Sequence, residues 1–511
     1  MGTFKNYQFY NFRGGLDLKN SAPLIAQSEK QVAWADGYNI ELLENGGITQ
    51  MKGSQFFAKL PTGEEDEIIG GAQGEQNGNK FIIIITKNGK LYQYQNGELH
   101  LKYSELAYDA KPNFKVYLNG LFISNGIDEP FLFIPNNEPE ILKANCTTEG
   151  GHNIRGNAIE IYKGRVWIAE GSTIYYSALG KFDDWTSIND AGSISNFHND
   201  TSRITALCCY KDVLVIHKEE NSFILSGNSP ENFTIQPFSN MGAISPFGIN
   251  SANGKHLFFN KEVYPFQTNE LGEIFQGSAI SLIIENKMQE FKNSKNKNCI
   301  FLNYKEKSQL WCFLYRTNKN YFDHILIYDY INNAWLLRIV PYQISTAWEC
   351  DGIIYCGLQD GRIVKEGIGN SFLGNPVKFL WASPFFHFGN MNQHKTIENL
   401  ALIFSTNKDN NFNFLTKKDY SNYEIFDKAS FSNTNSNTLV FCDAENNLGQ
   451  GVLDGDDITY GFITLVENKT ENFITNITGS NKSVQIQLYG DKNYHSLSLL
   501  GLEFKEVYTD A

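Results

Sequence analysis

The sequence lacks any long hydrophobic run. Apolar stretches such as Phe81–Ile85 and Leu257–Phe259 are far shorter than the roughly 20 residues that a membrane-spanning helix needs. Residues 1–25 have neither the apolar core nor the small-residue cleavage site of a secretory signal. Gly2 is not followed by Ser or Thr at the sixth position, which is Asn6, so the myristoylation pattern is also missing. We expect no membrane-spanning segment and a chain made in the cytoplasm without secretion.

Motifs of the common enzyme classes are also missing. The chain contains no GxxxxGK[ST] phosphate loop, no HExxH, no GxSxG elbow and no GxGxxG that opens a helix. The sequence therefore predicts no catalytic residues, no cofactor and no enzyme.

The 8 cysteines show no CxxC pair of the kind that holds zinc. Cys208, Cys312 and Cys356 lie in apolar strand patterns, so we expect buried thiols and no disulfides. Positive charge is scarce, because the formal net charge is −13. Such a surface repels nucleic acid phosphates and gives no general attraction to membranes.

What the sequence does have is a regular series of short alternating strands, each ended by a turn rich in Gly or Asn. Of the residues, 41% are hydrophobic and 14% aromatic, enough for a large core. Pairs such as Phe81–Thr86 with Lys90–Tyr94, and Ala158–Trp167 with Ser172–Ser177, recur every 35 to 50 residues or so. This spacing suits four-stranded blades, so the sequence predicts an all-β fold with a β-propeller.

Composition shifts at two places suggest three regions. A polar N-terminal arm with its first strands covers residues 1–60, the β-propeller covers 61–376, and a C-terminal antiparallel, sandwich-like β domain covers 377–511. The arm buries too little apolar area to be stable alone, so it either wraps its own domain or reaches a neighbouring subunit. Within it, we expect the strand Tyr38–Leu43 to complete an early or closing blade.

One segment breaks the strand pattern. Ile280, Ile283, Ile284, Met288 and Phe291 have the spacing of one helix face, which predicts a helix of about three turns. Ser278 is its expected N-cap. The only basic cluster follows here, and we expect a solvated helix end more than a phosphate clamp; its members are Lys287, Lys292, Lys295 and Lys297.

Candidate site residues are few. The best acidic group, a weak metal candidate, is Asp443, Glu445, Asn447 and Asp454. Leu448 stands where a calcium loop needs Gly, so a solvated turn is the better interpretation. Asp183 and Asp184 are adjacent and would face opposite ways on a strand, which favours a turn before Trp185. His217 is expected to be a strand residue and not a base.

Seven segments, in their order along the chain, form a recognisable series: NFRGGL, YNIELLENGGITQMKG, GRVWIAEGSTIYYSALGKFDDW, ITALCCYKDVLVIHKEENSFILSG, MGAISPFGI, HLFFNKEVYPF and WASPFFHFGNMNQHKTIENLALIF. In their order and spacing they resemble the tail nozzle, tail-hub and packaged-DNA-stabilisation proteins of short-tailed bacteriophages. The correspondence covers about residues 8–290, with Asn260–Glu262 departing where the family usually has a glycine, and it continues near the C-terminus.

The resemblance implies a structural virion protein of a phage tail. Such a protein forms a ring, expected to be a homohexamer, below the portal and the head-to-tail adaptor. It contacts other tail proteins, retains packaged double-stranded DNA and conducts it during ejection without specific binding. The family implies no catalytic residues. Polar stretches at Gly63–Asn79 and Lys292–Asn298 are candidate gating loops, and Trp34, Tyr38 and Trp185 are candidate ring contacts, although blade packing is the commoner fate of such residues.

Two other functions are weighed against this one. A propeller glycosidase or sialidase would need an arginine cluster and repeated SxDxGxxW-type turns, and Ser177–Trp185 lacks that spacing. A propeller adhesin that binds a receptor or glycan needs no catalytic residues, so the sequence leaves it open as the alternative.

Overall fold

The structure is a computed structural model of the 511-residue chain. It describes residues 5–20, 24, 25, 27, 28, 31–135, 140–389, 391–406, 410–419, 424–431, 440–442, 448–450, 462–464, 469–491 and 498–509. The chain divides into two compact units. Unit 1 comprises Met1–Gly53, Asn332–Arg338 and Gly369–Ala511, and unit 2 comprises Ser54–Ile331 and Ile339–Ile368.

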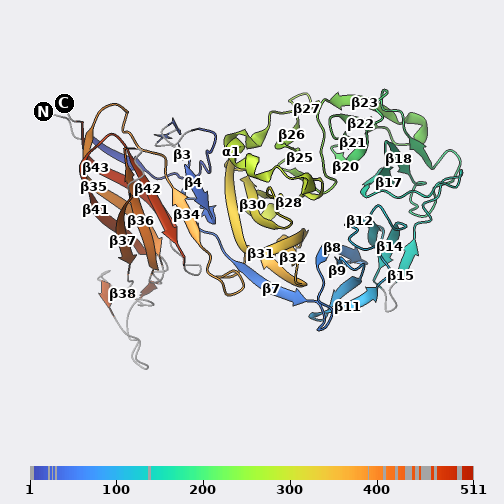
Figure 1. Cartoon of the computed structure of the whole chain (residues 1–511), viewed down its shortest axis with the longest axis horizontal. Helices are drawn as coiled ribbons and strands as arrows, with labels where there is room; N and C mark the ends of the chain where they lie inside the picture. The colour runs from blue at the N-terminus through green and yellow to red at the C-terminus, as the bar shows by residue number, and fades with distance from the viewer. Residues whose placement is uncertain are drawn as a thin grey trace. The chain divides into compact units, whose positions relative to one another are not determined.

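Unit 2 is a β-propeller, which confirms the predicted fold class (Figure 1). Its first five blades are separate four-stranded antiparallel sheets, each made of consecutive strands.

Blade 1 has β8 (Ile68–Gln76), β9 (Asn79–Thr86), β10 (Leu91–Gln95) and β11 (Glu98–Tyr103). Blade 2 has β12 (Asn113–Tyr117), β13 (Gly120–Ser124), β14 (Phe131–Ile134) and β15 (Glu140–Lys143). Blade 3 has β16 (Ala158–Tyr162), β17 (Arg165–Glu170), β18 (Thr173–Tyr176) and β19 (Gly192–Ile194). Blade 4 has β20 (Ile204–Tyr210), β21 (Val213–Lys218), β22 (Ser222–Ser226) and β23 (Thr234–Ser239). Blade 5 has β24 (Ile249–Ala252), β25 (Lys255–Asn260), β26 (Glu262–Thr268) and β27 (Ile274–Gln276).

A seven-stranded sheet supplies two more blades, so the described part of unit 2 has seven. The sheet runs in the order β28-β29-β30-β31-β32-β33-β7, and the long strand β31 is shared. The first strand of the unit pairs with the last, with Ser54 opposite Glu366 and Arg362 opposite Lys59. This pairing closes the ring of blades. The strands are β7 (Ser54–Lys59), β28 (Ile300–Tyr304), β29 (Gln309–Phe313), β30 (Phe322–Asp329), β31 (Ala334–Cys350), β32 (Ile353–Leu358) and β33 (Arg362–Glu366).

Each blade places its first strand nearest the propeller axis, since the first strands of neighbouring blades contact one another, as β12 contacts β16 and β16 contacts β20. Apolar side chains fill the space between blades. One cluster joins Trp167 and Ile174 of blade 3 to Leu214 and Phe223 of blade 4. Because strands alternate in direction, the loops between blades and the loops from second to third strands share one face of the propeller, here called the crossover face.

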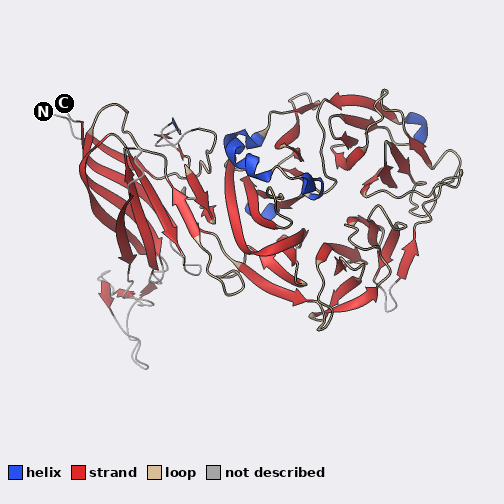
Figure 2. Cartoon of the chain, in the orientation of Figure 1, coloured by secondary structure: helices blue, strands red, loops and turns tan. Residues whose placement is uncertain are grey.

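The prediction of a helical segment over Ile280–Phe291 is confirmed, but most of the segment is 3-10 and not α-helix, and the predicted N-cap is wrong. The segment forms the 3-10 turns η3 (Ile280–Ile284) and η4 (Gln289–Phe291), with only the short α1 (Glu285–Met288) between them (Figure 2). The residue before η3 is Ala279, without a side-chain cap, and not Ser278. The Ser281 hydroxyl accepts the Val263 N–H at 2.9 Å and holds the first turn against β26. A further turn, η5 (Ser294–Asn298), leads into β28.

Unit 1 is built mainly from two antiparallel sheets whose aromatic side chains meet. One sheet has the order β41-β35-β43-β6-β5, with β1 also on β43, and the other β37-β36-β42-β34-β4. Phe9 of β1 lies 4.5 Å from Phe386, between ring centroids, and Phe386 lies 5.2 Å from Phe504 of β43. The strands are β1 (Lys5–Phe9), β4 (Asp36–Tyr38), β5 (Ile40–Leu42), β6 (Ile48–Gln50), β34 (Phe379–Ala382), β35 (Lys395–Thr406), β36 (Asn410–Lys418), β37 (Glu424–Phe431), β41 (Lys469–Asn481), β42 (Val484–Gly490) and β43 (Ser498–Thr509). Short strands form two small sheets, β2 (Gln27–Ser28) with β3 (Gln31–Val32), and β38 (Val440–Cys442) with β39 (Leu448–Gln450) and β40 (Phe462–Thr464).

The N-terminal strands belong to this sandwich, so the prediction that Tyr38–Leu43 completes a blade is wrong. β4 pairs with β34, and β5 pairs with β6, which pairs with β43. The last blade of the propeller is instead closed by β7, which pairs with β33. The described part of the arm thus wraps its own chain. No helix among the described residues is long and apolar enough to cross a bilayer.

Candidate functional site

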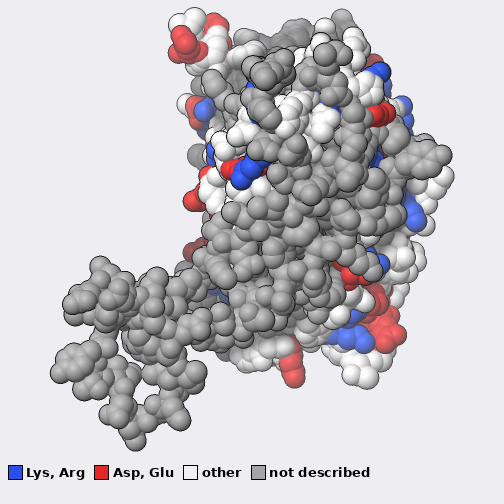
Figure 3. All heavy atoms as spheres, turned by 90° about the vertical axis from the view of Figure 1, so that its left-hand side faces the viewer, with Lys and Arg blue, Asp and Glu red and all other residues white. Residues whose placement is uncertain are grey.

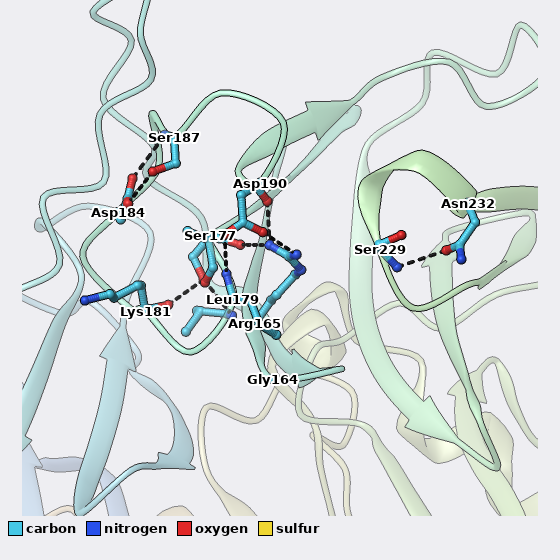
Figure 4. Close-up of polar contacts among 12 residues, drawn as sticks. Gly164, Arg165, Ser177, Leu179, Lys181, Asp184, Ser187, Asp190, Ser229 and Asn232 are labelled. Atoms are coloured by element: carbon cyan, nitrogen blue, oxygen red, sulfur yellow. Dashed lines mark hydrogen bonds and ion pairs between the residues drawn. The ribbon is translucent and has the colours of Figure 1, made fainter.

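The segment GRVWIAEGSTIYYSALGKFDDW forms β17, β18 and the loop that follows, and its arginine braces that loop (Figure 4). Arg165 is buried and pairs with Asp190 at 2.5 Å. Its guanidinium also donates to the carbonyls of Ser177 at 2.9 Å and Asp190 at 2.5 Å. The other Asp190 oxygen accepts the Leu179 N–H at 3.1 Å. One buried cation therefore fixes both ends of the loop.

Ser177 and Asp184 shape the same loop from within. The Ser177 hydroxyl accepts the Val166 N–H at 3.0 Å and donates to the Lys181 carbonyl at 2.7 Å. Asp184 accepts the Ser187 hydroxyl at 2.5 Å and the Ser187 N–H at 3.1 Å. The hydroxyl bond lowers the pKa of Asp184. As expected, Asp183 and Asp184 are not strand residues: the chain bends at Phe182 and Asp183 before Trp185. Asp184 is the hydrogen-bond acceptor for the residues that follow Trp185.

Trp185 is a blade-packing residue. It is buried, and its indole N–H donates to the Ala144 carbonyl at 3.0 Å, which ties blade 3 to the end of blade 2. Trp34 is likewise buried in unit 1 and donates to the Phe12 carbonyl at 2.6 Å. Both indoles are therefore buried within this chain, whereas Tyr38 is half-buried.

The segment ITALCCYKDVLVIHKEENSFILSG places a lysine inside blade 4. Lys218 is fully buried, and its ammonium donates to the Asp200 carbonyl at 2.6 Å and lies 3.3 Å from the Asp200 carboxylate. Burial opposes ionisation of Asp200, but hydrogen bonds from Ser202, Asn221 and Lys218 outweigh it and hold its pKa at about 2. The pair fastens the loop between blades 3 and 4.

The segment MGAISPFGI fits closely between blades 4, 5 and 6. A Cβ at Gly242 would lie 2.0 Å from the Lys218 carbonyl oxygen, and one at Gly248 would lie 2.4 Å from the Cys299 sulfur. Ser245 donates to the Cys299 carbonyl at 3.0 Å and accepts the N–H groups of Phe247 and Gly248. In the strand pair that follows, Lys261 takes φ +61, the left-handed conformation that a glycine would adopt readily.

His217 is a buried strand residue of β21, as predicted, and it pairs with His256 of β25. Their Nε2 atoms are 2.8 Å apart. Ser222 donates to the Met241 carbonyl at 2.7 Å, so its oxygen accepts the Nδ1–H of His217 at 2.9 Å. His217 Nε2 then accepts from His256, whose Nδ1 has no hydrogen-bond partner. Burial lowers the pKa of both imidazoles, that of His256 to about 3, so the pair is neutral.

Near the axis, the innermost strands carry one ion pair. Lys115 of β12 and Glu160 of β16 are 2.8 Å apart, and Glu160 also accepts the Ile161 N–H at 2.9 Å. Burial raises the pKa of the neighbouring Cys208 thiol to about 12, so this thiol stays protonated.

Cys312 and Cys356 are fully buried as predicted, whereas Cys208 is only half-buried. None of these seven cysteines forms a disulfide: Cys146, Cys208, Cys209, Cys299, Cys312, Cys350 and Cys356.

Lys111, which no sequence pattern singled out, spans the crossover face. It precedes blade 2, yet its ammonium donates to the Asn298 carbonyl, just before blade 6, at 2.9 Å. It also lies 4.7 Å from the ring centroid of Phe247, before blade 5. Blades 2 and 6 are not neighbours, so this side chain reaches across the propeller axis. Burial lowers its pKa to about 7.

The metal candidates Asp443, Glu445, Asn447 and Asp454 lie outside the described residues. Within the described ranges, no group of three or more His, Cys, Asp or Glu side chains is placed to hold a metal ion. On the face drawn in Figure 3, the described basic and acidic side chains are interspersed, without a continuous patch of one sign.

No family model matches this chain, and no curated protein matches it. Among solved structures, the computationally designed protein Ika8 is 12% identical with a TM-score of 0.35 and covers 61% of this chain and 100% of its own. The Pan2 WD40 domain of Neurospora crassa is 9% identical with a TM-score of 0.41 over 65% of this chain and 99% of its own. The extracellular domain of a putative one-component system from B. thetaiotaomicron is 10% identical with a TM-score of 0.40 over 77% and 51%.

Polar residues within the segments that carry the resemblance therefore brace the loops of blades 3 to 5. Arg165, Ser177, Asp184, Lys218 and Ser245 each spend their hydrogen-bonding groups on the chain's own loops. This arrangement stiffens blade junctions.

Proposed function

We propose that this chain is a structural protein of a phage tail, a subunit of a ring below the portal and adaptor that retains packaged double-stranded DNA and conducts it during ejection. One observation carries the proposal. Four of the segments that resemble tail nozzle and hub proteins follow one another through blades 3, 4 and 5 and the junctions between them. Their polar side chains brace those junctions, as Arg165 and Lys218 do. A mechanical role requires blade junctions that are braced in this way.

The electrostatics and the closed propeller support the same function. A formal net charge of −13 repels a polyanion that must slide past. Lys111 and Phe247 span the crossover face near the axis, so we place the DNA path in the centre of a ring of subunits and not along one propeller axis. In such a ring each subunit would present two different faces to its neighbours.

Electron microscopy of the purified full chain tests the ring. We expect annular particles, and a strictly monomeric chain that also fails to co-assemble with the adaptor would contradict the proposal. Virus particles made without the protein should package DNA and then lose it. If such particles keep their DNA and only fail to adsorb to cells, the protein is a receptor- or glycan-binding adhesin instead.

A further inference from the structure

Four lysines of the crossover face form what we call the lysine patch: Lys292, Lys295, Lys297 and Lys319. All four residues are exposed. Three follow α1 in the loop and turn that lead to blade 6, and Lys319 lies in the loop between β29 and β30. The lysine patch leaves out Lys287 of the cluster that the sequence suggested, because Lys287 pairs with Glu290 at 2.9 Å. It adds Lys319, which is distant in the sequence.

Hydrogen bonds hold the two loops of the patch together. The Asn293 amide donates to the carbonyls of Arg316 at 2.7 Å and Lys319 at 3.0 Å. The Thr317 hydroxyl donates to the Lys292 carbonyl at 3.2 Å. Buried Asn296 accepts the Tyr315 N–H at 2.7 Å and so anchors the turn η5 to blade 6. The lysines therefore extend from a fixed base.

Of the carboxylates near the patch, Glu290 and Asp323 are paired with other cations, and Glu285 is exposed. Glu290 pairs with Lys287, and Asp323 accepts the Arg316 Nε–H at 2.8 Å. Glu262, whose charge acts on Lys292, is half-buried, and burial raises its pKa despite a bond from Ser281. Among the described residues, no ion-pair partner is recorded for any of the four lysines. The patch is a local excess of positive charge on an acidic protein.

We propose that the lysine patch binds the phosphate backbone of double-stranded DNA. Lysine ammonium groups are point charges that suit phosphates without reading base sequence. The two lysine-bearing stretches read KNSKNKN (residues 292–298) and RTNK (residues 316–319), so they carry only Lys, Arg, Asn, Ser and Thr. Neither stretch offers an aromatic ring on which unpaired bases could stack or an apolar side chain that could enter a bilayer. Half-buried Tyr321, later in the second loop, donates to Glu67 at 3.3 Å. The choice of DNA over an acidic protein rests on the proposed function.

The number of lysines sets the expected strength. Four phosphate contacts give a slope of about −3.6 in a plot of log affinity against log salt, and hence a loss of about 100-fold between roughly 50 and 200 mM salt. Contacts of this kind are weak at physiological salt. They would guide or slow a moving duplex without retaining it.

The test is fluorescence anisotropy of a labelled mixed-sequence duplex with the full-length chain over this salt range. The patch variant carries Lys292→Gln, Lys295→Gln, Lys297→Gln and Lys319→Gln. The control variant carries four substitutions at exposed lysines elsewhere, which lower the net charge equally: Lys19→Gln, Lys181→Gln, Lys211→Gln and Lys305→Gln. We expect the patch variant to bind at least 30-fold more weakly at about 50 mM salt with a nearly flat slope, and the control to change less than about 3-fold.

Equal losses in the two variants, or no binding by the unmodified chain at low salt, would overturn the inference. So would a patch variant that loses only ring assembly, because the patch would then be a contact between copies of this chain. The same preparations are imaged for rings. Rings without DNA binding contradict this inference alone, whereas DNA binding without rings contradicts the proposed function.

Discussion

Acid should weaken the propeller at blades 4 and 5, because the histidine pair between β21 and β25 cannot accept a proton. His217 and His256 are fully buried, and the rings around them belong to Tyr210, Phe258 and Phe266. A proton on His256 Nδ1 would have no acceptor. If both imidazoles were protonated, their Nε2 atoms, which are 2.8 Å apart, would bring two positive charges into contact. Both groups therefore remain neutral in the folded protein at pH values where they are protonated in the unfolded chain.

The sign and size follow from the lowered pKa values. With folded-state values below an unfolded value of about 6.5, the unfolded chain binds more protons as the pH falls below that value, so the free energy of unfolding decreases with acid. Between about pH 7.5 and pH 5.0, each histidine that stays neutral when folded contributes about 2 kcal/mol, or about 4 kcal/mol for the pair. Asp200, with its pKa of about 2, affects stability mainly below this window.

Denaturant-dependent hydrogen exchange with mass spectrometry measures the effect locally, through peptides that cover β21 and β25. The double variant His217→Phe with His256→Phe places apolar rings among Phe258 and Phe266 and removes both titrating groups. We expect its opening free energy to be nearly constant over the window, whatever its absolute stability. The reasoning is refuted if the unmodified protein changes by less than about 1 kcal/mol, or if the double variant shows the same pH dependence.

Three further outcomes are expected. Asp190→Asn should lower unfolding stability by about 2 kcal/mol, because the buried Arg165 loses its counter-charge. Asp183→Asn, at an exposed residue of the same loop, should leave the melting temperature unchanged, and equal melting of both variants would contradict the brace. Gly242→Ala should cost more than about 3 kcal/mol or prevent folding, whereas Gly150→Ala, whose Cβ would meet nothing closer than 3.9 Å, should melt like the unmodified chain. Burial lowers the pKa of Lys111 to about 7, so above that pH the unfolded chain binds more protons than the folded protein, and the free energy of unfolding should rise from about pH 7 to pH 9. Lys111→Met should reduce this rise in thermal melts. An unchanged rise would show that the amine is not desolvated.

The propeller could be predicted from sequence because its signals are local. The hairpin of β16 and β17 turns at Lys163 and Gly164, which both have positive φ, and such turns pair strands that are close in the chain. The recurrence of these hairpins indicates blades. Loop braces such as Arg165 with Asp190 are 25 residues apart, and nothing in the residue pattern specifies that they meet.

The errors arise where partners are distant or where two helix types share a pattern. Strand β4 pairs with β34 some 340 residues later, and the local hairpin of β5 and β6 joins the sandwich through β43, so the local sequence cannot identify the sheets to which these strands belong. The apolar spacing of Ile280–Phe291 specifies a buried helical face, but it does not specify that the hydrogen bonding at the two ends of the segment is of the 3-10 type. In the structure Ile284, Met288 and Phe291 are buried, as the pattern requires, while Ile283 is 37% exposed.

Lys111 had no sequence signal at all. It is a lone lysine in an irregular segment, and its importance comes from the closed ring, which brings the loops before blades 2, 5 and 6 to the same axis. Only the topology of the propeller reveals that contact.

The pairing of β1 with β43 constrains how the protein is made on the ribosome. Phe9 lies opposite Leu502, so the first strand emerges long before its partner is translated, roughly half a minute or more at ordinary elongation rates. The propeller, whose closing strands β7 and β33 are both complete by Glu366, can fold during that wait. A nascent chain of this design therefore exposes the unpaired edge of β1 until β43 has been made, and only then is that edge protected from aggregation.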